Sequence, residues 1–347
     1  MSHEIDETNG KAAMAYVGGR PWHGLGQQLT EDADIATWKK EAGLNWKLKA
    51  SPVIYQTAGA HAIDETVGPQ FLDSTKQLVM PDRQLLFRSD TKAALSVVSD
   101  KYKIVQPGEV LDFYKELVES AGFKLETAGA LFGGRKFWAL ARCGDSAKIM
   151  GQDEIKPYLL LASSCDGSMA TVAHFTSVRV VCNNTLRMSI GPNGRNAKIR
   201  VPHNADFDHD AVQADLGIAT KAWDQFLASV RILAKEKINR DDAIDVIAGQ
   251  MKKSWLDEEE IEMPREKKME SSRALRRIIT LFDGEALGAD FKGCKGTSWG
   301  LLNAVTQYVD HESGSSNDKS RAFERAHLTD RANFKVAVAD ELLKIAG

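Results

Sequence analysis

Five cationic side chains lie in a stretch of sequence that contains no carboxylate. Between Gly167 and Ala205 there is no Asp or Glu, although the whole chain has 48 acidic and 45 basic residues and a net charge of −3. A nucleic-acid backbone favours cations at intervals with no carboxylate to repel its phosphates. The stretch therefore predicts a nucleic-acid contact made by Arg179, Arg187, Arg195, Lys198 and Arg200.

A predicted hairpin turn carries two more cations beside aromatic residues. Arg135 and Lys136 could extend the predicted nucleic-acid contact into a groove. Nearby, Phe132, Phe137 and Trp138 offer rings on which unpaired bases can stack. The alternative places these rings in the core, because side chains alternate across a strand. The five cations likewise have an alternative role, which is to pair with the acidic residues immediately downstream, Asp206, Asp208 and Asp210.

A second basic stretch follows the acidic run at residues 257–262. Its members are Arg265, Lys267, Lys268, Arg273, Arg276 and Arg277. The acidic and basic runs are expected to neutralise each other on a solvated surface. Arg273 and Arg277, four residues apart, share a helix face, so a phosphate contact or an oligomer contact is the alternative.

Catalytic patterns are weak. Cys182 follows His174 by eight residues, which does not ensure contact, and a buried structural cysteine is the favoured interpretation. His203 and His209 flank Asp206 and Asp208 without the spacing of a known metal motif. Phosphate-binding loops of the nucleotide-binding families are absent from the sequence. We therefore predict no enzyme, no catalytic residue, no metal and no cofactor.

Composition narrows the class of protein. The chain has 347 residues, 43% of them hydrophobic, and four cysteines without a close pair, which is typical of a reducing compartment. The balanced charge excludes a uniformly basic coat for duplex DNA, so any nucleic-acid contact is local. No apolar run reaches the roughly 18–20 residues that cross a bilayer, and the acidic N-terminus does not resemble a signal peptide. We expect a cytoplasmic protein without membrane contact.

Hydrophobic periodicity divides the chain into two parts. Up to residue 204 it predicts helices at 30–42, 107–121 and 177–190, and strands at 46–55, 85–88, 95–98, 102–105, 123–131, 136–142, 157–162, 168–175 and 198–201. From 205 to 347 it predicts helices at 211–238, 241–252, 271–282, 299–311 and 333–345. The predicted fold class is α+β: an antiparallel sheet with packed helices in the N-terminal part (1–204), followed by a mainly helical C-terminal region (205–347). A helix at 177–190 would place Arg179 and Arg187 on nearly one face.

Four segments resemble an uncharacterised family. These are Pro21-Trp-His-Gly-Leu-Gly26, Asp100-Lys-Tyr-Lys103, Arg179-Val-Val-Cys-Asn-Asn-Thr-Leu186 and Trp299-Gly-Leu-Leu-Asn-Ala304. They are similar to the "phage/plasmid-like protein" family, a domain of unknown function. The resemblance implies a phage or plasmid origin and a bacterial cytoplasm. The order of elements also has a weaker likeness to phage single-strand annealing proteins, which form rings around single-stranded DNA.

Two functions follow as expectations. The first is a cofactor-free protein that binds or anneals single-stranded DNA in recombination or replication and forms a homo-oligomer. The alternative is a non-enzymatic structural or host-interaction protein of a mobile element, whose helical part docks onto a host or replication protein.

Overall fold

A nine-stranded sheet forms the centre of the molecule in the computed structural model, which describes residues 5–8, 10–19, 21, 24–57, 76–179, 184–187, 189–190, 195–196, 198–201, 203, 220–252, 264–313 and 330–347. For the strands between residues 179 and 200 it describes the backbone and its pairing. The sheet runs in the order β13-β12-β11-β9-β8-β3-β4, with β10 beside β11 and β16 beside β12. Every pairing is antiparallel except that of β3 with β4.

The strands of this sheet are β3 (Met14–Val17), β4 (Gln27–Leu29), β8 (Lys124–Leu131), β9 (Lys136–Arg142), β10 (Ala147–Ile149), β11 (Asp153–Ser164), β12 (Thr171–Arg179), β13 (Asn184–Arg187) and β16 (Lys198–Val201). Two small pairs accompany it: β1 (Glu7–Thr8) with β2 (Lys11–Ala12), and β14 (Ser189–Ile190) with β15 (Arg195–Asn196). The hairpins predicted at 133–134 and 166–167 are confirmed as the β8–β9 and β11–β12 connections.

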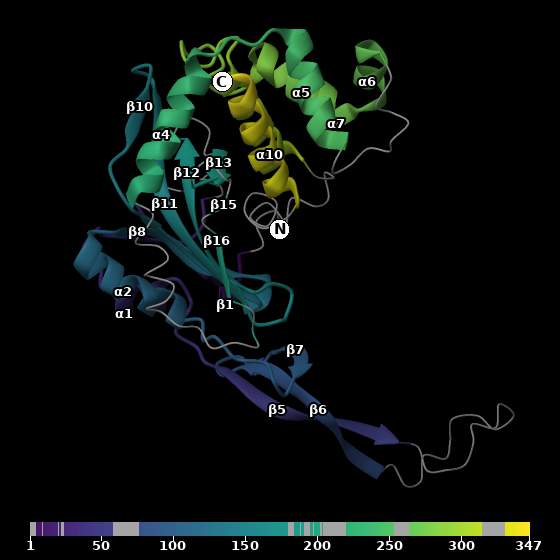
Figure 1. Cartoon of the computed structure of the whole chain (residues 1–347). Helices are drawn as coiled ribbons and strands as arrows, with labels where there is room; N and C mark the ends of the chain where they lie inside the picture. Colours follow the sequence, from purple (N-terminus) through teal and green to yellow (C-terminus); the bar gives the residue numbers. More distant parts are fainter. Residues whose placement is uncertain are drawn as a thin grey trace, which may run out of the picture.

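Two helices cover one face of the sheet (Figure 1). Helix α1 (Ile35–Glu41) begins at Asp34, whose side chain accepts a hydrogen bond from the Thr37 backbone N–H at 2.7 Å. Helix α2 (Glu109–Ala121) buries Tyr114, whose hydroxyl donates to the carbonyls of Ala139 and Leu159 at 3.0 and 2.9 Å. These bonds fix α2 against the middle strands.

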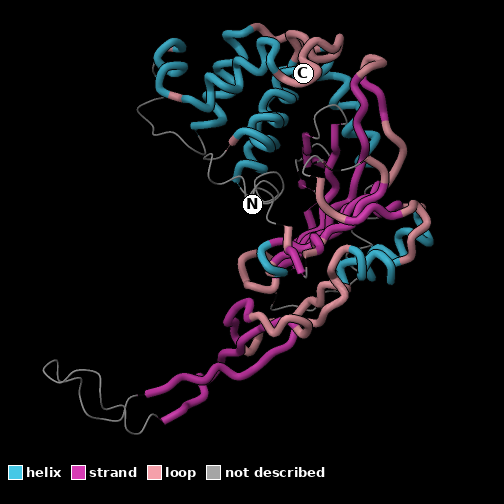
Figure 2. The backbone as a smooth tube through the Cα atoms, turned by 180° about the vertical axis from the view of Figure 1, so that it is seen from behind, coloured by secondary structure: helices cyan, strands magenta, loops and turns pink. Residues whose placement is uncertain are grey.

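A three-stranded sheet projects from the body as an arm. It contains β5 (Leu48–Thr57), β6 (Lys76–Arg88) and β7 (Ala94–Ser99), in the order β5-β6-β7. Both views show β5 and β6 extending away from the other elements (Figures 1 and 2). The predicted strand at 46–55 and the predicted hairpin at 85–98 are confirmed. Along the outer arm, Ile54 and Val79 pair with each other and are 57% and 61% exposed.

The predicted helix at 177–190 is wrong. Strand β12 continues to Arg179 by pairing with β11, and Asn184–Arg187 returns beside it as β13. The apolar spacing in this segment fits a helix, but β-branched residues such as Val178 and Thr185, which are register partners, favour a pleated sheet. The predicted strand at 102–105 is also wrong: these residues form a loop, in which the Tyr102 hydroxyl donates to the Ser164 carbonyl at 3.0 Å.

The C-terminal half is helical, as predicted. Its helices are α4 (Thr220–Lys235), α5 (Arg240–Lys252), α6 (Arg265–Ser271), α7 (Arg273–Thr280), α8 (Ser298–Gln307) and α10 (Asp330–Ile345). Two π-helical turns, η3 (Leu281–Glu285) and η4 (Tyr308–Glu312), continue α7 and α8. The first part of the helix predicted from residue 211 lies outside the described residues. None of the described helices is long and apolar enough to cross a membrane.

A buried carboxylate joins the two halves in the core. The fully buried carboxylate of Asp153, at the start of β11, accepts from the indole N–H of Trp299 at 2.9 Å, and the Cys294 thiol lies 3.5 Å from the same oxygen. Hydrophobic residues of both halves form one continuous cluster around it. The division at residues 204 and 205 therefore stays a prediction about the chain rather than a boundary between separate cores.

Candidate nucleic-acid interface

The turn between β8 and β9 presents two of the predicted cations. The turn is the short helix η1 (Phe132–Gly134), and Phe132, Gly133 and Gly134 all have positive φ, at 56°, 70° and 89°. Arg135 follows it and is exposed. Lys136 is partly buried, with its Nζ atom 5.1 Å from the centroid of the Phe132 ring. The turn thus places an ammonium beside a half-buried ring, directly after an exposed arginine.

A buried arginine holds this turn in place. Arg88 is only 3% exposed, and its guanidinium contacts both carboxylate oxygens of Asp90, at 3.0 and 2.8 Å, and one oxygen of Asp6. It also donates to the Gly133 carbonyl at 3.2 Å and lies 4.5 Å from the Trp46 ring centroid. The hydrogen bonds from Arg88 lower the pKa of Asp90, so this carboxylate stays charged.

The β11–β12 hairpin is attached to the same turn. The Cys165 backbone N–H donates to the Arg135 carbonyl at 2.8 Å, and its thiol lies 3.2 Å from the Gly134 carbonyl. Burial raises the pKa of the Cys165 thiol to about 12, so it stays a neutral donor rather than a nucleophile. The segment that begins the carboxylate-free stretch is therefore fixed beside Arg135.

Register places three of the other predicted cations on one face of the sheet. Lys198 and Arg200 in β16 pair with positions 174 and 172 of β12, and Arg187 in β13 pairs with position 176. Because alternate strand residues share a face, these three positions belong to the face that also carries Lys136 and Trp138. The prediction that Lys198 and Arg200 alternate on one strand is confirmed.

The remaining two predicted cations occupy different places. Arg179 pairs with Ile155 and lies at an odd position of β12, which belongs to the opposite face. Arg195 pairs with Ile190 in the separate β14–β15 pair. The expected alignment of Arg179 with Arg187 along a helix face is therefore wrong, because both residues lie in strands.

The centre of the cation-bearing face is closed. Leu160 and Val172 are buried there, and Trp138 is 7% exposed. Phe137, on the other face, is 1% exposed. Both rings therefore belong to the core, as the alternative interpretation expected, and only Phe132 keeps a partly exposed ring. The cation positions in β13 and β16 lie at the edge of the sheet, beyond β12, so the register describes a rim of positions rather than an open groove.

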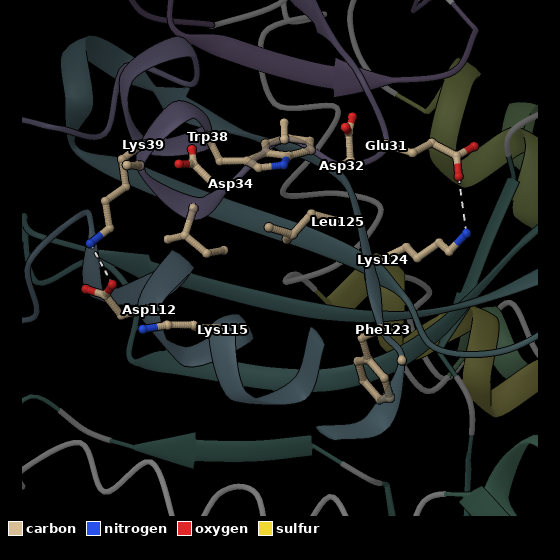
Figure 3. Close-up of a pocket in the computed structure, with 14 residues that line it drawn as sticks. Glu31, Asp32, Asp34, Trp38, Lys39, Asp112, Lys115, Phe123, Lys124 and Leu125 are labelled. Atoms are coloured by element: carbon tan, nitrogen blue, oxygen red, sulfur yellow. Dashed lines mark hydrogen bonds and ion pairs between the residues drawn. The ribbon is translucent and has the colours of Figure 1, made fainter. Parts of the chain in front are cut away.

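A cleft between α1, α2 and β8 was missed by the sequence analysis. It encloses about 710 Å³, with Trp38 and Leu125 at its base (Figure 3). Two ion pairs cross its walls: Lys39 with Asp112 at 2.6 Å, and Lys124 with Glu31 at 3.1 Å. Its lining contains four carboxylates and three ammonium groups, so the cleft has no excess positive charge for a nucleic acid.

The structure does not bring the weaker catalytic and metal candidates together into a site among the residues that it describes. Cys182 and His209 lie outside the described residues, and His174 is fully buried in β12. The His203 ring stacks on Tyr102 at 4.5 Å, and its nitrogens lie 3.0 and 3.3 Å from the carbonyls of Met169 and Lys103. Burial lowers the pKa of His203. In the part of the chain that the structure describes, no three His, Cys, Asp or Glu residues form a group able to hold a metal.

The remaining predicted sites have mixed outcomes. In the second basic stretch, Arg265 forms ion pairs with Asp241 and Asp245. Arg273 and Arg277 share a helix face in α7, as predicted. The acidic run at 257–262 lies outside the described residues, as do Asp206, Asp208 and Asp210.

Comparisons with known proteins identify the family of the chain. No curated protein and no solved structure matches it. The family described as "Domain of unknown function (DUF932)" matches residues 94–332, which include most of the large sheet and the helices from α4 to α8. The resemblance to a domain of unknown function, noted from four short segments, is therefore confirmed. The chain belongs to the DUF932 family.

Proposed function

We propose that the protein binds single-stranded DNA along the rim of its large sheet, without a cofactor. The observation that carries this proposal is the register of β13 and β16, which puts Arg187, Lys198 and Arg200 on the same face as Lys136. The sequence from Gly167 to Ala205 contains no carboxylate to oppose a phosphate. The positions in β13 and β16 lie at one edge of the sheet, and the exposed Arg135 follows the turn before β9.

The spacing of these positions suits a flexible strand. Two residues along β16 separate Lys198 from Arg200 by about 7 Å, and three strand spacings separate β16 from β9 by about 14 Å. A single strand can follow such a rim, and the half-buried Phe132 ring offers a stacking surface. A role in the recombination or replication of phage or plasmid DNA, in a bacterial cytoplasm and as a homo-oligomer, belongs to this proposal.

The test is a salt-dependent binding measurement. Fluorescence anisotropy with a labelled oligothymidine should show affinity that falls steeply between about 50 and about 200 mM salt, as phosphate contacts require. Lys198→Glu with Arg200→Glu should weaken binding about tenfold or more at the lower salt. Lys148→Glu with Lys267→Glu makes the same charge change at exposed residues of β10 and α6, and should have little effect.

Two results would contradict the proposal. One is the absence of salt-dependent binding by the wild type. The other is an equal loss of affinity in both double variants, which would indicate a general charge effect rather than a local contact.

A second function is favoured by the arm. The exposed Ile54 and Val79, together with Tyr55 and Met80, form apolar surface on a two-stranded ribbon, and such surface commonly marks protein contacts. It supports the alternative of a structural or host-interaction protein. A pull-down from a nuclease-treated bacterial lysate, with the wild type and with Ile54→Thr plus Val79→Thr, tests it. One host protein that the wild type recovers in stoichiometric amount and the variant loses supports a contact through the arm, and equal recovery excludes it.

A further inference from the structure

A second cationic site lies in the helical half, far in sequence from the proposed rim. It is a hollow of about 430 Å³ between α7 and η4. Its lining residues are Arg273, Arg276, Arg277, Thr280, Tyr308 and Glu312. Three guanidinium groups therefore share one small cavity with one carboxylate.

Helix α7 presents the three arginines on one side. Ser272 caps α7 by accepting from the Leu275 backbone N–H at 3.2 Å, and Leu275, Ile278 and Ile279 are buried on the opposite side. Residues three and four apart on a helix are neighbours, so Arg273 lies beside both other arginines. Burial of the apolar side leaves the arginines no alternative but to face the cavity wall or solvent.

Arg277 forms ion pairs with the nearby carboxylates. It contacts both carboxylate oxygens of Glu312, at 2.5 and 3.1 Å, and also pairs with Glu285. These contacts raise the pKa of Arg277. By contrast, neither Arg273 nor Arg276 has a side-chain hydrogen bond or an ion pair with any residue that the structure describes. Among the residues that the structure describes, Arg273 and Arg276 thus line the cavity without forming an ion pair.

Tyr308 adds a neutral donor. Burial raises the pKa of its hydroxyl, although the charges of Arg331 and Arg273 oppose that effect. The hydroxyl is therefore protonated at neutral pH. Arg331 is held nearby by a hydrogen bond to the Ser313 carbonyl at 2.5 Å, so a further cation contributes to the field around the tyrosine.

We propose that this cavity binds the phosphate group of a small phosphorylated ligand. Arg273 and Arg276 would each present a planar pair of N–H donors, which matches phosphate oxygens, and Tyr308 would donate from the other wall. The carboxylate of Glu312 is occupied by Arg277, which screens the anion from it. The size of the hollow fits the lower part of the range for small-ligand pockets, about 300–1,000 Å³.

Calorimetry at constant ionic strength tests the proposal, with inorganic phosphate and adenosine monophosphate as probes. Both should bind saturably, and Arg273→Gln with Arg276→Gln should weaken binding about tenfold or more. Arg240→Gln with Arg265→Gln is the matched control, because these exposed arginines pair with acidic residues outside the cavity, and it should bind as the wild type does. Tyr308→Phe should lose a smaller, severalfold part of the affinity.

The outcomes are distinguishable. Tighter binding of the nucleotide than of phosphate supports a phosphate ester as ligand, and equal binding supports free phosphate. Arg273→Lys with Arg276→Lys should show intermediate affinity with an unchanged circular dichroism spectrum, which separates lost donors from lost folding. The proposal is overturned if neither probe binds, if only an oligonucleotide binds, or if the control variant loses as much as the cavity variant.

Discussion

The sheet half and the helical half each bury a charged pair, and they do so differently. In the sheet half, Arg88 contacts the nearby Asp90 and, from segments far apart in sequence, a second carboxylate, a carbonyl and an indole ring. In the helical half, Lys335 of α10 meets Asp310 of η4 at 2.6 Å, and both are almost fully buried. A guanidinium has five N–H donors in a fixed plane, whereas an ammonium is a compact charge. Arginine thus suits a junction of several loops, and lysine suits the contact of two packed elements.

The largest effect should come from the lysine pair. Lys335→Met removes the ammonium group that lies 2.6 Å from the buried Asp310 carboxylate, which should lower the free energy of unfolding by about 3–5 kcal/mol. Urea denaturation measures it. Lys344→Met, at the exposed end of the same helix, breaks a surface pair and should change stability little. Similar losses in both variants would mean that burial does not distinguish these pairs.

A smaller effect is expected at the arginine junction. Arg88→Lys keeps the charge but loses the planar donors, which should cost about 1.5–3 kcal/mol because hydrogen bonds to charged partners break. The variant should also bind oligothymidine more weakly, since Arg88 holds the turn that carries Arg135. Unchanged stability together with unchanged binding would show that charge alone is enough at this junction.

Two adjacent glycines sharpen the role of Arg88. A Cβ atom on Gly134 would lie 2.9 Å from the Arg88 guanidinium and 2.9 Å from the Trp46 ring. Gly134→Ala should therefore cost about 1–3 kcal/mol in unfolding free energy. Gly133→Ala meets nothing within 4 Å and adds only the cost of a positive φ, about 1–2 kcal/mol. Thermal unfolding of both variants compares them, and an equal loss would remove the steric explanation.

The smallest effect is a pH dependence near His203. Burial lowers its pKa in the folded state below the ordinary value of 6.5, so the unfolded chain binds a proton first as the pH falls. Stability should therefore decrease from about pH 7.5 to about pH 5.5, and His203→Gln should make this decrease shallower. Asp90 does not contribute to this decrease, because its pKa is lowered below the ordinary value of 3.8. The stabilisation by its charged carboxylate is therefore lost only at more acidic pH. A slope unchanged in the variant would contradict the prediction.

Local patterns predicted the helical half and the hairpins, but not the contacts between distant segments. Turn residues such as Gly133 and Gly167 mark connections that the structure contains. The apolar spacing after Thr176 predicts a helix, but the structure has a strand there because these residues pair with β11. Arg88 gave no signal in the sequence, since Asp6 lies 82 residues away and only the folded chain brings the two together. The register that puts Lys198 on the same face as Lys136 also depends on pairing between distant segments.

The family match begins at residue 94, so both long strands of the arm precede it. At the base of the arm, Gln106 connects β5 to the region that the family model matches. Its side chain accepts from the Leu48 backbone N–H at 2.8 Å and donates to the Leu48 carbonyl at 3.2 Å. Of the described ribbon residues, 53–57 and 76–85, none belongs to the main hydrophobic cluster. The distal ribbon is consequently a natural handle: a reporter or affinity hairpin grafted there would tether the molecule to a surface without disturbing its interior.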